Sequence, residues 1–207
     1  MISPIFTTIT LLGAFIWLYM KITQKKTKSM DEPFWERERL ANQTRKQPLD
    51  SLSYIIIPLD FLPFIKDTEN EKLQECQQSI TTLSSQKIVN LTGISNTDLK
   101  LTYGVANITV LSEYDQNYTL LIRTLHAWGR ELYDSGLKAE AQTVLEYAVS
   151  CKSDIKGTYS LLADIYTETN MYDKIDSLIE SAESLDSLTR NVILSCLRDK
   201  SVYALLK

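Results

Sequence analysis

The chain has 207 residues, of which 44% are hydrophobic, and 22 basic side chains against 26 acidic ones give a formal net charge of −4. This composition supports a packed core and excludes an intrinsically disordered chain. The acidic balance also argues against nucleic acid as a partner, because neutralising phosphates needs a basic surface.

The first twenty residues carry no charged side chain. At about 1.5 Å per residue they would form a helix of roughly 30 Å, the thickness of a bilayer core. Basic residues follow the stretch and none precedes it, at Lys21, Lys25, Lys26 and Lys28. The sequence therefore predicts a retained single-pass anchor over residues 1–22, with the N-terminus outside and the C-terminal domain cytoplasmic. The same lysines could contact anionic lipid.

Residues 23–69 are predicted to continue with a basic juxtamembrane segment, an amphipathic helix that Pro48 ends, and an apolar strip over residues 52–65. The helix could lie on a membrane surface or pack against the domain, and both interpretations stay open. Prolines interrupt the strip and it is too short to span a bilayer, so we expect an extended segment. Burial within its own domain is favoured over binding to a partner.

Residues 70–121 are predicted to hold one helix and an irregular segment. Apolar side chains recur every three or four residues over 70–85, which indicates a helix with one buried face. Residues 86–111 mix β-branched residues with turn formers. A short helix beginning at Asn96 or Thr97 and a short pair of strands are both compatible with this pattern, and its role stays open.

Two segments of residues 122–185 align at a period of 34 without a gap. In the first segment the matching positions are Leu125, Trp128, Gly129, Leu132, Gly136, Ala141, Leu145 and Ala148. In the second they are Tyr159, Leu162, Ala163, Tyr166, Asn170, Ile175, Ile179 and Ala182. The first four of each set share one helix face, the Gly or Asn falls at a turn, and the last three share a face of a second helix. The pattern predicts a helical hairpin used twice.

This spacing resembles the tetratricopeptide repeat, a 34-residue unit in which small residues let two helices pack closely. Gly129 and Ala163 stand at the small position of the first helix, whereas the Trp and the closing Pro typical of the family are absent. The whole arrangement also resembles small bacterial membrane-anchored proteins of unassigned function. The resemblance implies a mainly α fold in which residues 122–207 form two hairpins and a capping helix over residues 188–206.

The sequence shows no pattern typical of a catalytic, cofactor or metal site. His126 is the only histidine, and no Cys or acidic pair stands near it at metal-ligand spacing. Three cysteines, Cys76, Cys151 and Cys196, are far apart and are predicted to be reduced. No phosphate-binding glycine loop or nucleophile motif is present.

The repeats favour a membrane-tethered, non-enzymatic scaffold or adaptor that binds a peptide or helix of a protein partner on its helical face. Arg123, Arg130 and Tyr159 are the residues expected to face that partner. An alternative is a small structural subunit of a membrane complex that uses its transmembrane helix as a contact, since Gly13 and Ala14 form a small-residue patch. An enzyme without a sequence motif is the least favoured hypothesis.

Overall fold

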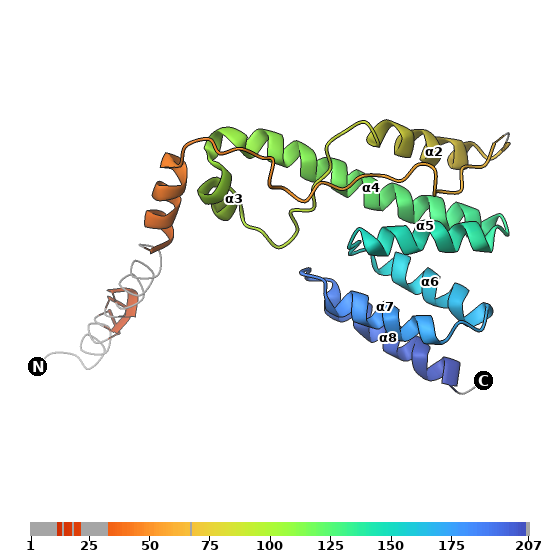
Figure 1. Ribbon diagram of the computed structural model, residues 1–207. Coiled ribbons are helices and arrows are strands. Elements are labelled where there is room, and N and C mark those ends of the chain that lie inside the picture. The colour runs from red at the N-terminus through yellow and green to blue at the C-terminus, as the bar shows by residue number, and fades with distance from the viewer. Residues whose placement is uncertain (1–11, 14, 18, 22–32, 67, 206–207) are drawn as a thin grey trace, which may run out of the picture. The chain divides into compact units, whose positions relative to one another are not determined.

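The computed structural model describes residues 12–13, 15–17, 19–21, 33–66 and 68–205, and it describes their side chains up to residue 201. This part of the chain is mainly helical (Figure 1). Its only strand-like pairing is an antiparallel bridge between Tyr54 and Val89. The described residues form two compact units: residues up to 48 with 95–108, and residues 49–94 with those from 109 onward.

The predicted membrane anchor is not supported. Within the described residues, no helix is both long enough and apolar enough to cross a bilayer. The prediction of a transmembrane helix over residues 1–22, and with it the single-pass membrane localisation with a cytoplasmic domain, was wrong. A span needs about 20 consecutive, predominantly apolar residues in one helix, and no helix of the described residues meets that requirement. Residues 1–11 and the lysines at 25, 26 and 28 lie outside the described residues.

In the first unit, residues 33–43 form a helix, which ends earlier than the predicted stop at Pro48. Glu38 on this helix accepts a hydrogen bond of 2.7 Å from Thr97 and forms an ion pair with Lys100. Both partners belong to α3 (Asn96–Tyr103), whose first turn is capped by the hydroxyl of Ser95. Packing within the protein, one of the two alternatives left open for the 33–43 helix, is therefore observed.

The first unit continues through a tight turn into η1 (Val105–Asn107). Gly104 there has φ of +84°, and a Cβ atom at this position would clash with the backbone carbonyl of Arg45. The amide of Asn107 closes the turn by donating 2.7 Å hydrogen bonds to the carbonyls of Gln47 and Tyr103. Of the two alternatives left open for residues 86–111, a short helix is observed in the second half of this segment, as α3.

In the second unit, α2 (Glu71–Leu83) is capped by Asn70, the residue before it. The side chain of Asn70 accepts hydrogen bonds from backbone amides of the first turn. The apolar strip is irregular and lies against the same core, in which Ile57 and Leu62 are 6% and 5% exposed. The side chain of Gln77 in α2 bonds the backbone N–H and C=O of Ile65. Burial of the strip within its own domain is thereby confirmed, although Ile56 stays 86% exposed.

The remaining helices of the second unit are α4 (Ile108–Asp134), α5 (Lys138–Ser150), α6 (Lys156–Glu168), α7 (Asp173–Glu183) and α8 (Arg190–Leu205). The C-terminal half of α4 with α5, and α6 with α7, correspond to the two predicted hairpins (Figure 1). Helix α6 packs on α5 and α8, and α7 packs on α8. All the aligned apolar positions are buried except Ile179, which is half-buried.

The close contact between the helices of the first hairpin depends on a glycine. A Cβ atom at Gly129 in α4 would lie 2.6 Å from the side chain of Leu145 in α5. Trp128, the neighbouring residue, is fully buried and its ring centroid lies 5.1 Å from that of Phe64 in the apolar strip. The small residue expected at this position therefore does permit close packing.

The capping helix begins later than expected. Predicted to start at residue 188, α8 begins at Arg190, and its buried residues are Ile193, Leu194 and Leu197. Leu188 and Val192, two apolar residues within the predicted range of this helix, are 102% and 54% exposed. Leu188 precedes the helix, so it does not share the helical period.

Candidate functional site

The candidate site is the face that the first helices of the hairpins share, which we call the A-face. It comprises exposed or half-buried residues of the C-terminal half of α4, of α6 and of α8. Figure 1 shows α4 and α6 in successive hairpins, followed by α8. The contact of α6 with α8 makes this surface continuous over those two helices.

His126 connects α4 to α6 at this face. Its ring packs over Gly157, where a Cβ atom would lie 2.6 Å from the imidazole Cε1. The imidazole Nδ1 is 3.3 Å from the hydroxyl of Thr158, which is fully buried. Burial, together with the positive charge of Arg130, lowers the pKa of His126 below its ordinary value. Both effects disfavour the charged imidazolium, so the structure gives His126 a packing role between α4 and α6.

Arg123 and Arg130 both lie exposed on α4, about one helical turn on either side of His126. Arg130 is 3.6 Å from the carboxylate of Asp134 on its own helix. Arg123 makes no hydrogen bond or ion pair with another described residue. The structure thus brings two of the three predicted partner-binding residues to one exposed surface.

Tyr159, the third predicted residue, lies elsewhere. It is 1% exposed and belongs to the core between the helices. Its hydroxyl is buried and has no hydrogen-bond partner in the described part of the chain. Burial, and next to it the negative charge of Asp154, raises the pKa of Tyr159. The phenol is therefore a packing element and is not available at the surface.

A shallow cavity of about 490 Å³ lies on the A-face between α6 and α8. Lys156 from the first turn of α6 and Asn191 from the first turn of α8 line one end of it. Lys200 lines it as well and forms an ion pair with Asp164 on α6. Sequence reasoning missed these residues because only the packing of α6 on α8 brings them together.

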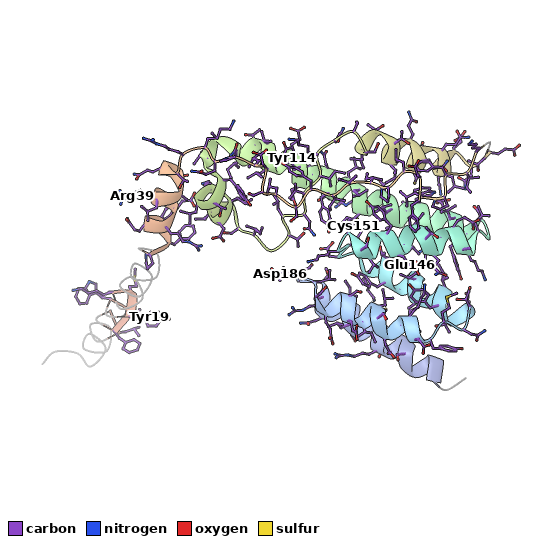
Figure 2. The ribbon with its side chains drawn as sticks, viewed as in Figure 1. Tyr19, Arg39, Tyr114, Glu146, Cys151 and Asp186 are labelled. Atoms are coloured by element: carbon purple, nitrogen blue, oxygen red, sulfur yellow. The ribbon has the colours of Figure 1, made fainter. Side chains whose placement is uncertain are left out.

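A polar cluster centred on Glu146, which Figure 2 labels, joins α5 and α7, the second helices of the hairpins, and includes Tyr166 of α6. One carboxylate oxygen of Glu146 in α5 accepts hydrogen bonds from Gln142 at 2.8 Å, Tyr166 at 2.9 Å and Lys174 at 2.7 Å. Burial alone raises the pKa of Glu146, but these three donors outweigh it and lower the pKa. Because Glu146 and Gln142 belong to the first hairpin and Tyr166 and Lys174 to the second, this cluster fastens the two hairpins to each other.

The described side chains contain no group of three His, Cys, Asp or Glu residues able to hold a metal ion. Burial raises the pKa of the Cys151 thiol and of the Cys76 thiol, which keeps both in the less reactive protonated form. All three cysteines are free thiols.

Comparisons with protein-family models, with curated proteins and with solved structures find no match for this chain.

Proposed function

We propose that this chain is a non-enzymatic protein-interaction module, and that its hairpins are tetratricopeptide-like repeats that bind an extended peptide or a helix on the A-face. Two features support the repeat assignment. The hairpins recur at a period of 34 with the same turn geometry, since Gly136 and Asn170 have φ of +80° and +58°. Gly129 also lets the first hairpin close on Leu145, as the small residue of such repeats does.

The observation that carries the proposal is the charge of the A-face. Arg123 and Lys156 are exposed there, and neither forms a hydrogen bond or ion pair with another residue of the described chain. Carboxylates lie on the same helices, but Asp134 and Asp164 are paired with Arg130 and Lys200. Arg123 and Lys156 are therefore cations that a ligand can pair with. A partner segment with carboxylates spaced along it would pair with these cations and be distinguished from neutral segments. The partner proposed is therefore an acidic peptide or acidic helix.

The sequence alone also suggested a subunit of a membrane complex. That hypothesis relied on a transmembrane helix as the contact, and no such helix is present among the described residues. We do not retain it.

Site-specific photocrosslinking in the native host tests the proposal. A benzophenone side chain is placed at Ala127, which is exposed on α4, and as a matched control at Glu180, which is exposed on α7. We expect Ala127 to crosslink to one recurring protein, at a segment rich in Asp and Glu, and Glu180 not to do so. The double charge reversal Arg123→Glu with Arg130→Glu should abolish that crosslink, because it replaces attraction by repulsion.

Two results would count against an A-face partner. One is the same set of proteins at both crosslinking positions, and the other is an Ala127 crosslink that survives the charge reversal. Either would show that the cations of the A-face do not select what binds.

A further inference from the structure

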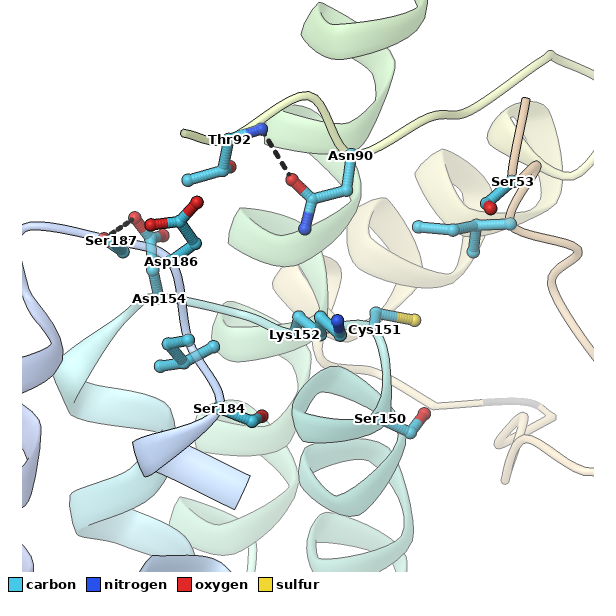
Figure 3. A pocket seen from close by; sticks show the side chains of 12 residues that line it. Ser53, Asn90, Thr92, Ser150, Cys151, Lys152, Asp154, Ser184, Asp186 and Ser187 are labelled. Atoms are coloured by element: carbon cyan, nitrogen blue, oxygen red, sulfur yellow. Dashed lines mark hydrogen bonds between the residues drawn. The ribbon is translucent and has the colours of Figure 1, made fainter. Parts of the chain in front are cut away.

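A second cavity lies away from the A-face, where the loops between the helices of the second unit meet. It has a volume of about 360 Å³ and is lined by side chains from residues 53–55, 90–92, 150–154 and 184–187 (Figure 3). This size falls at the lower end of the range for pockets that bind small molecules, about 300–1,000 Å³. The lining includes both charges, several hydroxyls and an amide.

Lys152 has an unusual backbone at this cavity. Its φ is +59°, in the left-handed region that Gly and Asn adopt easily and lysine does not. All other described residues with positive φ are glycines or Asn170. The hydroxyl of Tyr118 holds the turn that contains Lys152. It donates to the backbone carbonyls of Lys152 at 2.8 Å and Cys151 at 3.2 Å. A lysine therefore occupies a position where glycine would be less strained, and the hydrogen bonds from Tyr118 hold its backbone in place.

Asp186 stands 34 residues after Lys152, in the corresponding loop of the next hairpin, and lines the same cavity. Neither charged group forms a hydrogen bond or ion pair with another described side chain, so the ammonium and the carboxylate do not neutralise each other. The neighbouring carboxylate, Asp154, accepts a 3.0 Å hydrogen bond from Ser187. Figure 3 shows Asp154 and Asp186 at one side of the cavity and Lys152 apart from them.

The uncharged groups of the lining have defined hydrogen-bonding roles. Ser150 and Ser184 each donate their hydroxyl proton to a backbone carbonyl of their own helix, both at 2.7 Å. Their oxygens can therefore only accept a further hydrogen bond in the cavity. Asn90 accepts from the amide of Thr92 at 2.9 Å through its carbonyl oxygen, which leaves its NH₂ group free to donate.

The wall that carries Asp186 depends on a glycine. Gly93 has φ of +85°, and a Cβ atom there would clash with the carboxylate of Asp186. The backbone of residues 90–93 can approach the carboxylate only because this side chain is missing. The cavity thus combines one free ammonium, one free carboxylate, hydroxyl acceptors and an amide donor in a small volume.

We propose that this cavity binds a small zwitterion with a primary ammonium group and a carboxylate, a free α-amino acid being the simplest case. The carboxylate of Asp186 pairs with the ligand's ammonium group, and Ser184 adds an acceptor. The ammonium of Lys152 and the NH₂ group of Asn90 pair with the ligand's carboxylate. Charge-assisted hydrogen bonds of this kind are about twice as strong as neutral ones. The site is distinct from the A-face, so it does not depend on the interaction proposed there.

Isothermal titration calorimetry on the full chain tests the inference, with each of the twenty common L-amino acids as a separate probe. We expect saturable 1:1 binding of at least one of them. Methylamine and acetate, which carry only one of the two charges, should bind at least about tenfold more weakly than that amino acid, because each lacks one charge-assisted contact. N-acetylation or amidation of the amino acid should weaken binding by a similar factor.

Two variants and two matched controls locate the binding. Lys152→Gln and Asp186→Asn should each weaken binding by about tenfold or more. Lys66→Gln and Asp176→Asn, which also remove exposed charges but lie away from this cavity, should leave the affinity unchanged. Thermal denaturation of each variant shows that it is folded. Absence of heat with all twenty amino acids, equal affinity for acetate or methylamine, or unchanged affinity in Lys152→Gln and Asp186→Asn would each overturn the inference.

Discussion

Gly136 and Asn170 lie 34 residues apart and close their hairpins with the same left-handed backbone, at φ of +80° and +58°. The hydrogen bonds of the two turns also correspond. The amide of Leu137 donates to the carbonyl of Leu132 at 2.9 Å, and that of Met171 donates to Tyr166 at 2.8 Å. The repeat in the sequence is therefore a repeat of backbone geometry as well.

The first prediction concerns these turns. Gly136→Ala should lower the free energy of unfolding by about 1 kcal/mol, because the left-handed conformation is unfavourable for a residue with a Cβ atom. No atom lies within 4 Å of a Cβ atom built at Gly136, so the cost is conformational and not steric. Gly136→Asn is the matched control and should lose less, since Asn170 adopts this conformation in the second turn. Urea denaturation measures both, and equal losses for Ala and Asn would contradict the explanation.

The second prediction concerns the contact between α4 and α5. Gly129→Ala should destabilise the protein by about 1–3 kcal/mol, because its Cβ atom would overlap with Leu145, which is fully buried. If overlap is the cause, Leu145→Val should be less harmful in the Gly129→Ala background than in the parent protein. A double-mutant cycle by urea denaturation measures this coupling. Strictly additive losses would show that the two residues do not compete for space.

Local patterns in the sequence were sufficient to predict the hairpins. Gly136 and Asn170 indicated the turns because their residue types favour positive φ, and the apolar positions on both sides followed a helical period. A helix starting near Asn96, where α3 begins, was one of the two alternatives left open for that segment, and it rested on residues that cap helices. In each case the signal lies within a few residues of the feature.

Features that depend on distant contacts were not predicted. The apolar spacing near the C-terminus could not show that α8 begins after Leu188, so the capping helix was predicted to start too early, at residue 188. Tyr159 was expected at the surface, but the packing of α6 turns its ring into the core. The cavity that contains Lys152 and Asp186 needs the chain near Ser53 and Asn90 as well. Nothing in the local sequence brings four such segments together.

The third prediction uses the fact that His126 is the only histidine. Its imidazole signals in a proton NMR titration should have a midpoint below the ordinary value of about 6.5, because burial and Arg130 disfavour the charged form. The same titration in concentrated urea should give about 6.5. Arg130→Gln should raise the midpoint in the folded protein, whereas Arg123→Gln should have a smaller effect. A midpoint at or above the urea value would contradict the packing assigned to His126.

This lowered pKa has a consequence for stability, which is the fourth prediction. The unfolded chain binds a proton at His126 more readily than the folded chain does. The free energy of unfolding should therefore fall as the pH drops below about 6.5, until the folded histidine is protonated as well. His126→Gln should remove this part of the pH dependence. Urea denaturation between pH 7.5 and pH 5 measures it, since those limits lie on either side of the unfolded pKa at about 6.5. An equal slope in His126→Gln would assign the dependence to other groups.

The fifth prediction concerns the carboxylate of Glu146, which joins the two hairpins through Lys174 and Tyr166. Glu146→Gln should lower the free energy of unfolding at pH 7 by about 0.5–1 kcal/mol, a modest loss because the ion pair is partly exposed. The pKa of this carboxyl is lowered in the folded state, so its contribution is complete above the unfolded value of about 4.3.

As the pH falls through the folded pKa of Glu146, that contribution disappears, because the protonated carboxyl no longer attracts the ammonium of Lys174. The parent protein and Glu146→Gln should therefore differ in stability at pH 7 and become alike in acid. Glu180→Gln is the matched control: it removes an exposed carboxylate of α7 and should change stability little at either pH. Urea denaturation at neutral and acidic pH measures all three proteins. A difference between Glu146→Gln and the parent that persists unchanged in acid would show that shape, and not charge, makes Glu146 stabilising.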